Sequence, residues 1–168
     1  KKVIRIASKF EYLTFQSDYF TIPFSTEVTG TPLIHLKIGQ TDERRLKMDT
    51  GSVGFLSTDY DHYGKLQEQN QILAERSSYG ISSIGLFGAS EKDTILQVLI
   101  KDFSMGDLTI NEQIIDLKRS KSSLLGMSFL KNYLVTINWK TNTLLLSPQG
   151  DFQNAFSESF GISLLKEE

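Results

Sequence analysis

The residues best suited to chemistry lie together in one short stretch, Asp49-Thr50-Gly51-Ser52. An acid is followed there by a hydroxyl, a glycine and a second hydroxyl, just after the apolar residues Leu46 and Met48. A carboxylate in such a place can act as a general base or acid on a bound water. The pattern is also typical of an ordinary turn, because Asp bonds to nearby backbone and Gly tolerates a positive φ. The rest of the chain must decide between these two interpretations.

The chain lacks the residues that other hydrolytic mechanisms need. It contains no cysteine, which excludes thiol nucleophiles, disulfides and cysteine-bound zinc. The histidines are His35 and His62 alone, and no Gly-x-Ser-x-Gly elbow is present. Residues 59–70 begin like a calcium-binding loop but lack two of its oxygen ligands. Residues 80–86 have the glycine spacing of a phosphate-binding loop but lack the lysine that such a loop needs. We therefore expect neither a metal ion nor a cofactor.

Length and composition are those of one globular domain. The chain has 168 residues, 39% of them hydrophobic, and a net charge of −2. The densest basic cluster, residues 118–121, is too short for the sustained basic face of a nucleic-acid-binding protein. No apolar run reaches the roughly 20 residues that span a bilayer. The first residue is Lys rather than Met, which indicates a processed chain. The sequence does not decide the cellular compartment; a periplasmic or secreted location after signal removal is one option.

Short β-strands are predicted along most of the chain. Apolar or alternating runs bounded by turn residues predict strands at 3–6, 19–22, 33–38, 45–48, 94–100, 134–139 and 143–146. Residues 103–110 are predicted to form a strand, a Gly-Asp turn and another strand. A cap at Thr58 or Asp59 predicts a helix that runs to Arg76, and a second short helix is expected at 128–133. We therefore predict an all-β fold, a closed or partly closed barrel with one or two short helices.

Residues 77–90 form a Gly- and Ser-rich segment with interspersed apolar side chains. This composition suits a mobile hairpin with an apolar underside. A plain surface hairpin is the alternative, and composition alone favours it. The residues of the segment that could contact a substrate are Tyr79, Gly80, Ile81, Ile84 and Gly85.

A second apolar stretch, Leu124-Leu125-Gly126-Met127, has its glycine 77 residues after Asp49 (126 − 49) and leads into a predicted helix and strand. The order of acid turn, Gly-rich hairpin and glycine-containing apolar stretch resembles the retropepsins, the single-lobe aspartic proteases of retroviruses and their bacterial relatives. The resemblance covers roughly residues 32–146. It implies an acid-protease barrel lobe at 29–148, preceded by an N-terminal β extension (1–28) and followed by a C-terminal tail (149–168) that packs on the domain.

The resemblance implies an aspartic endopeptidase that cleaves polypeptides, with Asp49 as its catalytic residue. This mechanism needs two carboxylates, and the chain carries one Asp-Thr-Gly motif. The chain must therefore pair with a copy of itself around a twofold axis between the two Asp49 side chains. Two carboxyl groups about 3 Å apart cannot both ionise easily, so they hold one proton between them and serve as base and acid.

The other residues of the two motifs have expected roles that follow from this chemistry. The Gly51 N–H and the Ser52 hydroxyl can each bond to Asp49, and Gly126 permits a strand to cross closely behind the turn. Thr50 is expected to be a buried hydroxyl that needs a partner; by resemblance, that partner is the backbone of the opposing turn, and the Gly-rich hairpin is a flap.

Two other functions remain open from sequence. One is a non-catalytic binding or dimerisation module that keeps the fold, and the other is one lobe of a larger protease. The complete Asp-Thr-Gly-Ser favours the enzyme, because a decayed domain has no chemical reason to keep the acid. The two terminal additions could remodel the dimer interface, which the viral enzymes build from their chain ends.

Overall fold

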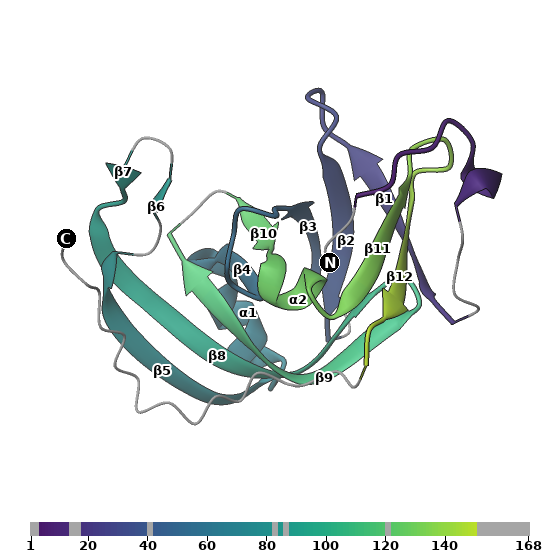
Figure 1. Ribbon diagram of the computed structural model, residues 1–168. Helices are drawn as coiled ribbons and strands as arrows, with labels where there is room; N and C mark the ends of the chain where they lie inside the picture. Colours follow the sequence, from purple (N-terminus) through teal and green to yellow (C-terminus); the bar gives the residue numbers. More distant parts are fainter. Residues whose placement is uncertain are drawn as a thin grey trace.

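The computed structural model describes residues 4–13, 18–39, 42–81, 84–85, 88–119 and 122–150 (Figure 1). The predicted all-β class with short helices is confirmed. The strands are β1 (Phe20–Thr26), β2 (Pro32–Ile38), β3 (Asp42–Met48), β4 (Leu56–Asp59), β5 (Ile72–Ile81), β6 (Ile84–Gly85), β7 (Gly88–Ala89), β8 (Lys92–Met105), β9 (Leu108–Lys118), β10 (Ser123–Leu125), β11 (Tyr133–Asn138) and β12 (Thr143–Pro148). The helical segments are η1 (Phe10–Tyr12), η2 (Tyr60–His62), α1 (Tyr63–Glu68) and α2 (Met127–Leu130). In the described part of the chain, no helix has the length and apolar character needed to cross a bilayer.

One ten-stranded sheet contains nearly all the strands, in the order β11-β12-β1-β2-β3-β10-β4-β9-β8-β5. An additional pairing joins β2 to β8, through Lys37 opposite Ser104 and Ile38 opposite Phe103. This pairing closes β2, β3, β10, β4, β9 and β8 into a ring, while β1, β12, β11 and β5 extend from it. The partly closed barrel that the sequence predicts is therefore present.

The core lies inside this ring because its strands alternate buried apolar and outward polar side chains. In β2, Ile34, Leu36 and Ile38 are fully buried, whereas His35 and Lys37 between them are exposed. The same alternation places residues from the other ring strands inside. They include Leu46, Leu56, Val98, Ile100, Phe103, Ile115, Leu117 and Leu125.

Strand β1 belongs to the same sheet and changes partner at its middle. Residues 20–23 pair with β12, and residues 24–26 pair with β2. Pro23, which has no N–H to donate, lies where the partner changes. The predicted strand at 3–6 is wrong for its described residues: Ile4 and Ile6 are exposed and form no strand, because no described segment pairs with them or covers them.

The predicted helix from Thr58 or Asp59 to Arg76 is correct at its start and too long at its end. The Asp59 side chain accepts a hydrogen bond from the Asp61 N–H at 2.9 Å, and η2 then leads into α1. The six-residue α1 is followed within a few residues by β5, which begins at Ile72. Residues 72–76, predicted as helix, are therefore strand.

Asn70 ends the helix. Its φ is 52°, a left-handed conformation that Asn tolerates better than most residues. The Gln71 N–H then donates to the Leu66 carbonyl, and the Asn70 N–H donates to the Gln67 carbonyl, both at 2.9 Å. These two bonds form a Schellman motif, which satisfies the last helical carbonyls and turns the chain into β5.

Candidate active site

Asp49 lies at the end of β3, above the point where β10 enters the sheet. Strand β10 lies between β3 and β4, parallel to β3 and antiparallel to β4. The chain from β3 to β4, residues 49–55, must therefore pass over the end of β10. The Asp49 N–H donates to the Leu125 carbonyl of β10 at 3.0 Å, which ties the start of this active-site turn (residues 49–55) to that strand.

The Asp49 side chain is partly buried and is held from within the turn. The Gly51 N–H donates to Asp49 Oδ1 at 2.8 Å, so this predicted hydrogen bond is confirmed. The Ser52 N–H donates to the Asp49 carbonyl at 3.3 Å. The predicted bond from the Ser52 hydroxyl to the outer oxygen of Asp49 is not formed among the described residues. Ser52 contacts Asp49 through its backbone N–H instead.

Gly126 is packed against the back of the active-site turn. A Cβ built there would clash with the Gly54 carbonyl oxygen and would lie only 2.8 Å from the Ser52 carbonyl oxygen. Both are backbone atoms that cannot yield without moving the turn. The prediction that a glycine lets the strand cross closely behind Asp49 is therefore confirmed.

The start of α2 satisfies the carbonyls of the active-site turn one after another. The Met127 N–H donates to the Ser52 carbonyl at 2.7 Å, and the Ser128 N–H donates to the Gly54 carbonyl at 3.2 Å. The Ser128 hydroxyl donates to the Val53 carbonyl at 2.7 Å. Since these carbonyls all have partners, the turn is fixed on its inner side and presents its outer side to solvent.

That outer side is open in the single chain. Thr50 and Gly51 are exposed, and the Val53 side chain is 85% exposed. The expectation that the Thr50 hydroxyl is buried is wrong for one chain, because no segment of the described chain covers it. The exposed residues of the active-site turn thus form a small uncovered surface around Asp49.

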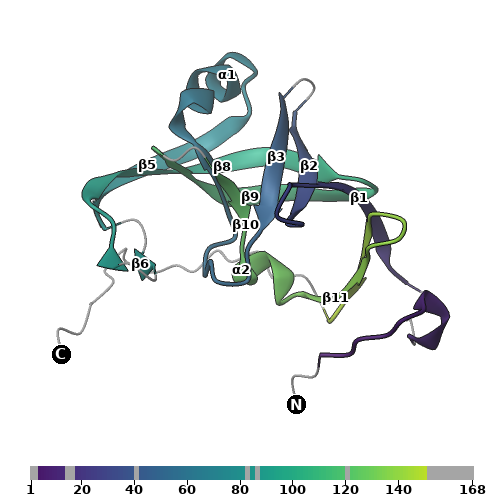
Figure 2. The same ribbon diagram turned by 90° about the horizontal axis from the view of Figure 1, so that it is seen from above.

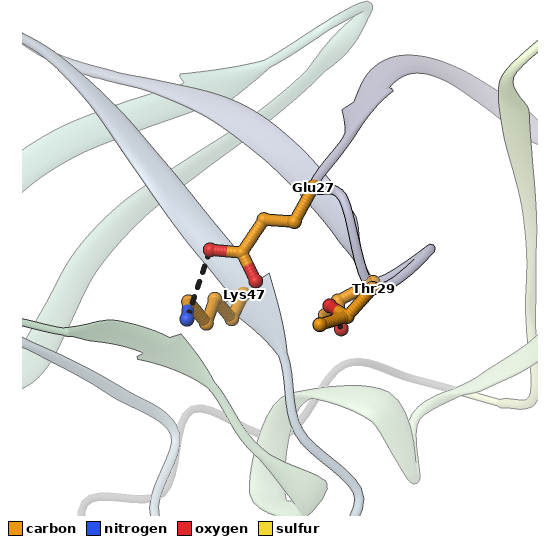
Figure 3. A network of polar contacts seen from close by, with 4 residues as sticks. Glu27, Thr29 and Lys47 are labelled. Atoms are coloured by element: carbon orange, nitrogen blue, oxygen red, sulfur yellow. Dashed lines mark hydrogen bonds and ion pairs between the residues drawn. The ribbon is translucent and has the colours of Figure 1, made fainter.

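An ion pair lies beside Asp49 on the same strand. Lys47 stands two residues before Asp49, so alternation places both on one face of β3. The Lys47 ammonium lies 2.9 Å from a Glu27 carboxylate oxygen in the loop between β1 and β2, where Thr29 also lies (Figure 3). Both side chains are about one-third exposed, and the pair neutralises the cation closest in sequence to Asp49.

The predicted flap residues lie on the hairpin of β5 and β8. Tyr79, Gly80 and Ile81 are the last residues of β5 and pair with residues 92–94 of β8. Ile84 and Gly85 form β6, which pairs with β7. In both ribbon views β5 and β8 extend away from the barrel and lead to β6 and β7 (Figures 1 and 2). The role of this hairpin as a flap stays a prediction, and the predicted packing of the tail beyond residue 150 lies outside the described residues.

Sequence analysis missed two polar groups near the active-site turn. One is the Glu27–Lys47 pair, and the other is Asp116 of β9, whose Oδ2 would lie 3.8 Å from a Cβ built on Gly54. Lys47 could have been found from its spacing to Asp49. Glu27 and Asp116 come from distant segments, so only the register of the sheet brings them to the site.

Among the described residues, no group of three or more His, Cys, Asp or Glu side chains is placed to hold a metal ion. A surface pocket between residues 7–13 and the β11–β12 turn is lined by side chains that include Phe10 and Trp139. It contains no residue of the active-site turn.

No protein-family model matches the chain, and a comparison with curated proteins found no match either. Among solved structures, the chain is similar to a retropepsin-like aspartic protease from Rickettsia conorii, with 13% sequence identity and a TM-score of 0.48. That similarity covers 80% of this chain and 95% of the other.

Proposed function

We propose that this protein is an aspartic endopeptidase that acts as a homodimer, with Asp49 of each copy at the reacting centre. The observation that carries the proposal is how Asp49 is held. Its Oδ1 accepts from the Gly51 N–H, its own N–H is bound to β10, and the turn that carries it is fixed from behind by Gly126. A carboxylate fixed in this way on an otherwise uncovered turn is suited to general acid–base chemistry.

The chemistry requires two carboxyl groups that share one proton. The ionised carboxylate takes a proton from a water molecule as the water oxygen attacks the peptide carbonyl carbon. The protonated carboxyl gives its proton to the carbonyl oxygen, which yields a tetrahedral diol. Collapse of the diol breaks the C–N bond, while a proton moves to the leaving nitrogen. Activity should therefore follow a bell-shaped pH profile on the acid side of neutrality.

Pairing of two chains supplies the second carboxyl group. The sequence has one Asp-Thr-Gly motif, and the outer side of the active-site turn, with Thr50 and Val53, is uncovered in one chain. In the proposed dimer, the two turns face each other across a twofold axis, and each Thr50 hydroxyl bonds to the backbone of the opposing turn. Residues 29–148 are the proposed protease domain, and the β5–β8 hairpin is the proposed flap over an extended polypeptide.

Asp49→Asn tests the proposal. The substitution is nearly isosteric, so the fold should be kept, but an amide cannot hold or release the shared proton. Cleavage of an unbiased peptide library, read by mass spectrometry, should fall by orders of magnitude. The matched control is Asp102→Asn, which removes one carboxylate charge from a partly buried position on β8 and should leave cleavage unchanged. Full cleavage by Asp49→Asn, or loss of cleavage on adding a metal chelator, would contradict the aspartic mechanism.

A further inference from the structure

Asp116 faces the active-site turn from a neighbouring strand. A Cβ built on Gly54 would lie 3.8 Å from Asp116 Oδ2 and 3.9 Å from the Ser52 hydroxyl oxygen. Both distances are ordinary van der Waals contacts, so the Asp116 carboxylate lies directly beside the backbone of the turn at Gly54. Asp116 is partly buried. A second acidic side chain therefore lies beside the turn that carries Asp49.

A chain of hydrogen bonds fixes the orientation of this carboxylate. Gln97 Nε2 donates to Asp116 Oδ1 at 2.8 Å, and Arg76 Nε donates to Gln97 Oε1 at 2.6 Å. The three residues stand directly opposite one another on β5, β8 and β9. Since opposite residues share a face of the sheet, this row holds Oδ1, while Oδ2 lies beside Gly54.

The same row continues toward Asp49. Asp116 stands opposite Ser57 of β4, Ser57 opposite Leu124 of β10, and Leu124 opposite Lys47 of β3. Lys47 shares its face of β3 with Asp49, two residues later. Asp116 and Lys47 therefore lie on the face of the sheet that carries the proposed catalytic residue.

Lys47 and Asp116 differ in whether an opposite charge neutralises them. Lys47 is paired with Glu27 at 2.9 Å. Within the described ranges, no ammonium or guanidinium group forms an ion pair with Asp116, because the neutral Gln97 amide stands between it and Arg76. Oδ2 has no hydrogen-bond donor among those residues. A fixed, partly buried carboxylate with one unused oxygen favours a cationic donor.

From this geometry we propose that Asp116 is a specificity-determining residue that accepts a lysine or arginine side chain of the substrate close to the scissile bond. The proposal rests on the proposed peptidase function and names the substrate class of the same site. Asp116 Oδ2 receives the basic side chain beside Gly54, while Gln97 and Arg76 are positioning residues that hold the carboxylate. The paired Lys47 does not repel such a substrate.

The test is the ratio of kcat/KM for two peptides that differ only in one basic or neutral residue near the cleaved bond. The cleavage sites found in the peptide library decide which position, relative to the cleaved bond, carries the basic residue. The wild-type ratio should favour the basic peptide about ten- to a hundredfold, and Asp116→Asn should reduce it toward one. Asp102→Asn, which removes the same charge from the neighbouring strand β8, should keep the wild-type ratio.

A second variant tests the proposal independently, in case Asp116→Asn does not fold. Gly54→Ala places a methyl group at ordinary contact distance from Oδ2 without a backbone clash. The methyl group hinders the approach of a basic side chain to Oδ2, so this variant should also reduce the ratio. A wild-type ratio near one, or equal loss of both peptides in Asp116→Asn, would overturn the specificity proposal and leave the peptidase function standing. Absence of any peptide cleavage by the wild-type protein would overturn both.

Discussion

Gly126 shows how strongly a single residue shapes the geometry around Asp49. It stands where α2 begins, and the carbonyls of Ser52 and Gly54 approach the position that its Cβ would occupy. Sequence analysis predicted this role from an apolar stretch interrupted by glycine. The predicted Gly51 bond to Asp49 also follows from local chemistry, since both residues lie in one turn. Thr50 is exposed in the single chain, because the burial of a turn depends on what packs over it, which local sequence does not contain.

Gly126→Ala should destabilise the protein by about 1–3 kcal/mol, because the new methyl group forces two backbone carbonyls to move. Peptide cleavage should fall as well, because the displaced turn carries Asp49. The matched control is Gly64→Ala in α1, where a Cβ meets nothing within 4 Å. That variant should be stabilised by about 0.5–1 kcal/mol through its lower unfolded-state entropy. Urea unfolding of both variants measures the difference; equal stability would contradict the steric account.

Tyr133 gives the chain a defined response to alkaline pH. It is 8% exposed and packs against the rings of Phe20 and Phe129. Burial raises the pKa of Tyr133 from 10.0 to about 12, so the folded protein holds this proton more tightly than the unfolded chain. The associated stability is complete below pH 10.0, and it is lost as the pH rises toward about 12.

Tyr133→Phe should therefore flatten the fall in unfolding free energy across this alkaline range. Denaturant unfolding at closely spaced pH values measures the slope for the wild type and the variant. Tyr79→Phe, at a position that is 74% exposed, is the matched control for the loss of a phenolic hydroxyl. If Tyr133→Phe kept the full wild-type slope, burial of this phenol would not be the cause.

The secondary-structure elements were predictable where local pattern and tertiary pairing agree. Alternation in residues 33–38 and the long apolar runs of residues 94–100 correspond to β2 and β8. The prediction failed at residues 72–76, where helix-forming side chains continue past α1 but Asn70 adopts a positive φ and the chain pairs with β8 instead. Asn70 was the available signal, since Asn is favoured after a helix end. In residues 72–76, strand pairing outweighs the helix propensity of the side chains.

Gly80→Val tests whether the β5–β8 hairpin is a flap. A Cβ at Gly80 meets nothing within 4 Å, and valine suits a strand, so the variant should fold as stably as the wild type. If the hairpin closes on a substrate, the added side chain should lower kcat/KM about tenfold or more. The control is Thr109→Val at an exposed position of β9. Unaltered cleavage by Gly80→Val would identify a plain surface hairpin.

At the scale of the whole molecule, the site is assembled by register across strands that are distant in sequence. Glu27, Lys47 and Asp116 come from three separate segments, and β10 enters the sheet between two strands that precede it by many residues. The barrel and the order of the motifs could be anticipated from patterns along the chain. The position of β1 between β12 and β2 and the approach of Asp116 could not, since they depend on which strands pair.

The central claim is that two chains each contribute one Asp49 to a single reacting centre. Adding excess Asp49→Asn chain to a fixed amount of wild-type chain tests it most directly, above the concentration at which dimers dissociate. Mixed dimers would hold only one functional carboxylate, so a ninefold excess should reduce cleavage about tenfold. Excess Asp102→Asn chain should not reduce it. Wild-type cleavage that is unchanged by excess Asp49→Asn would show that one chain acts alone and would contradict the account.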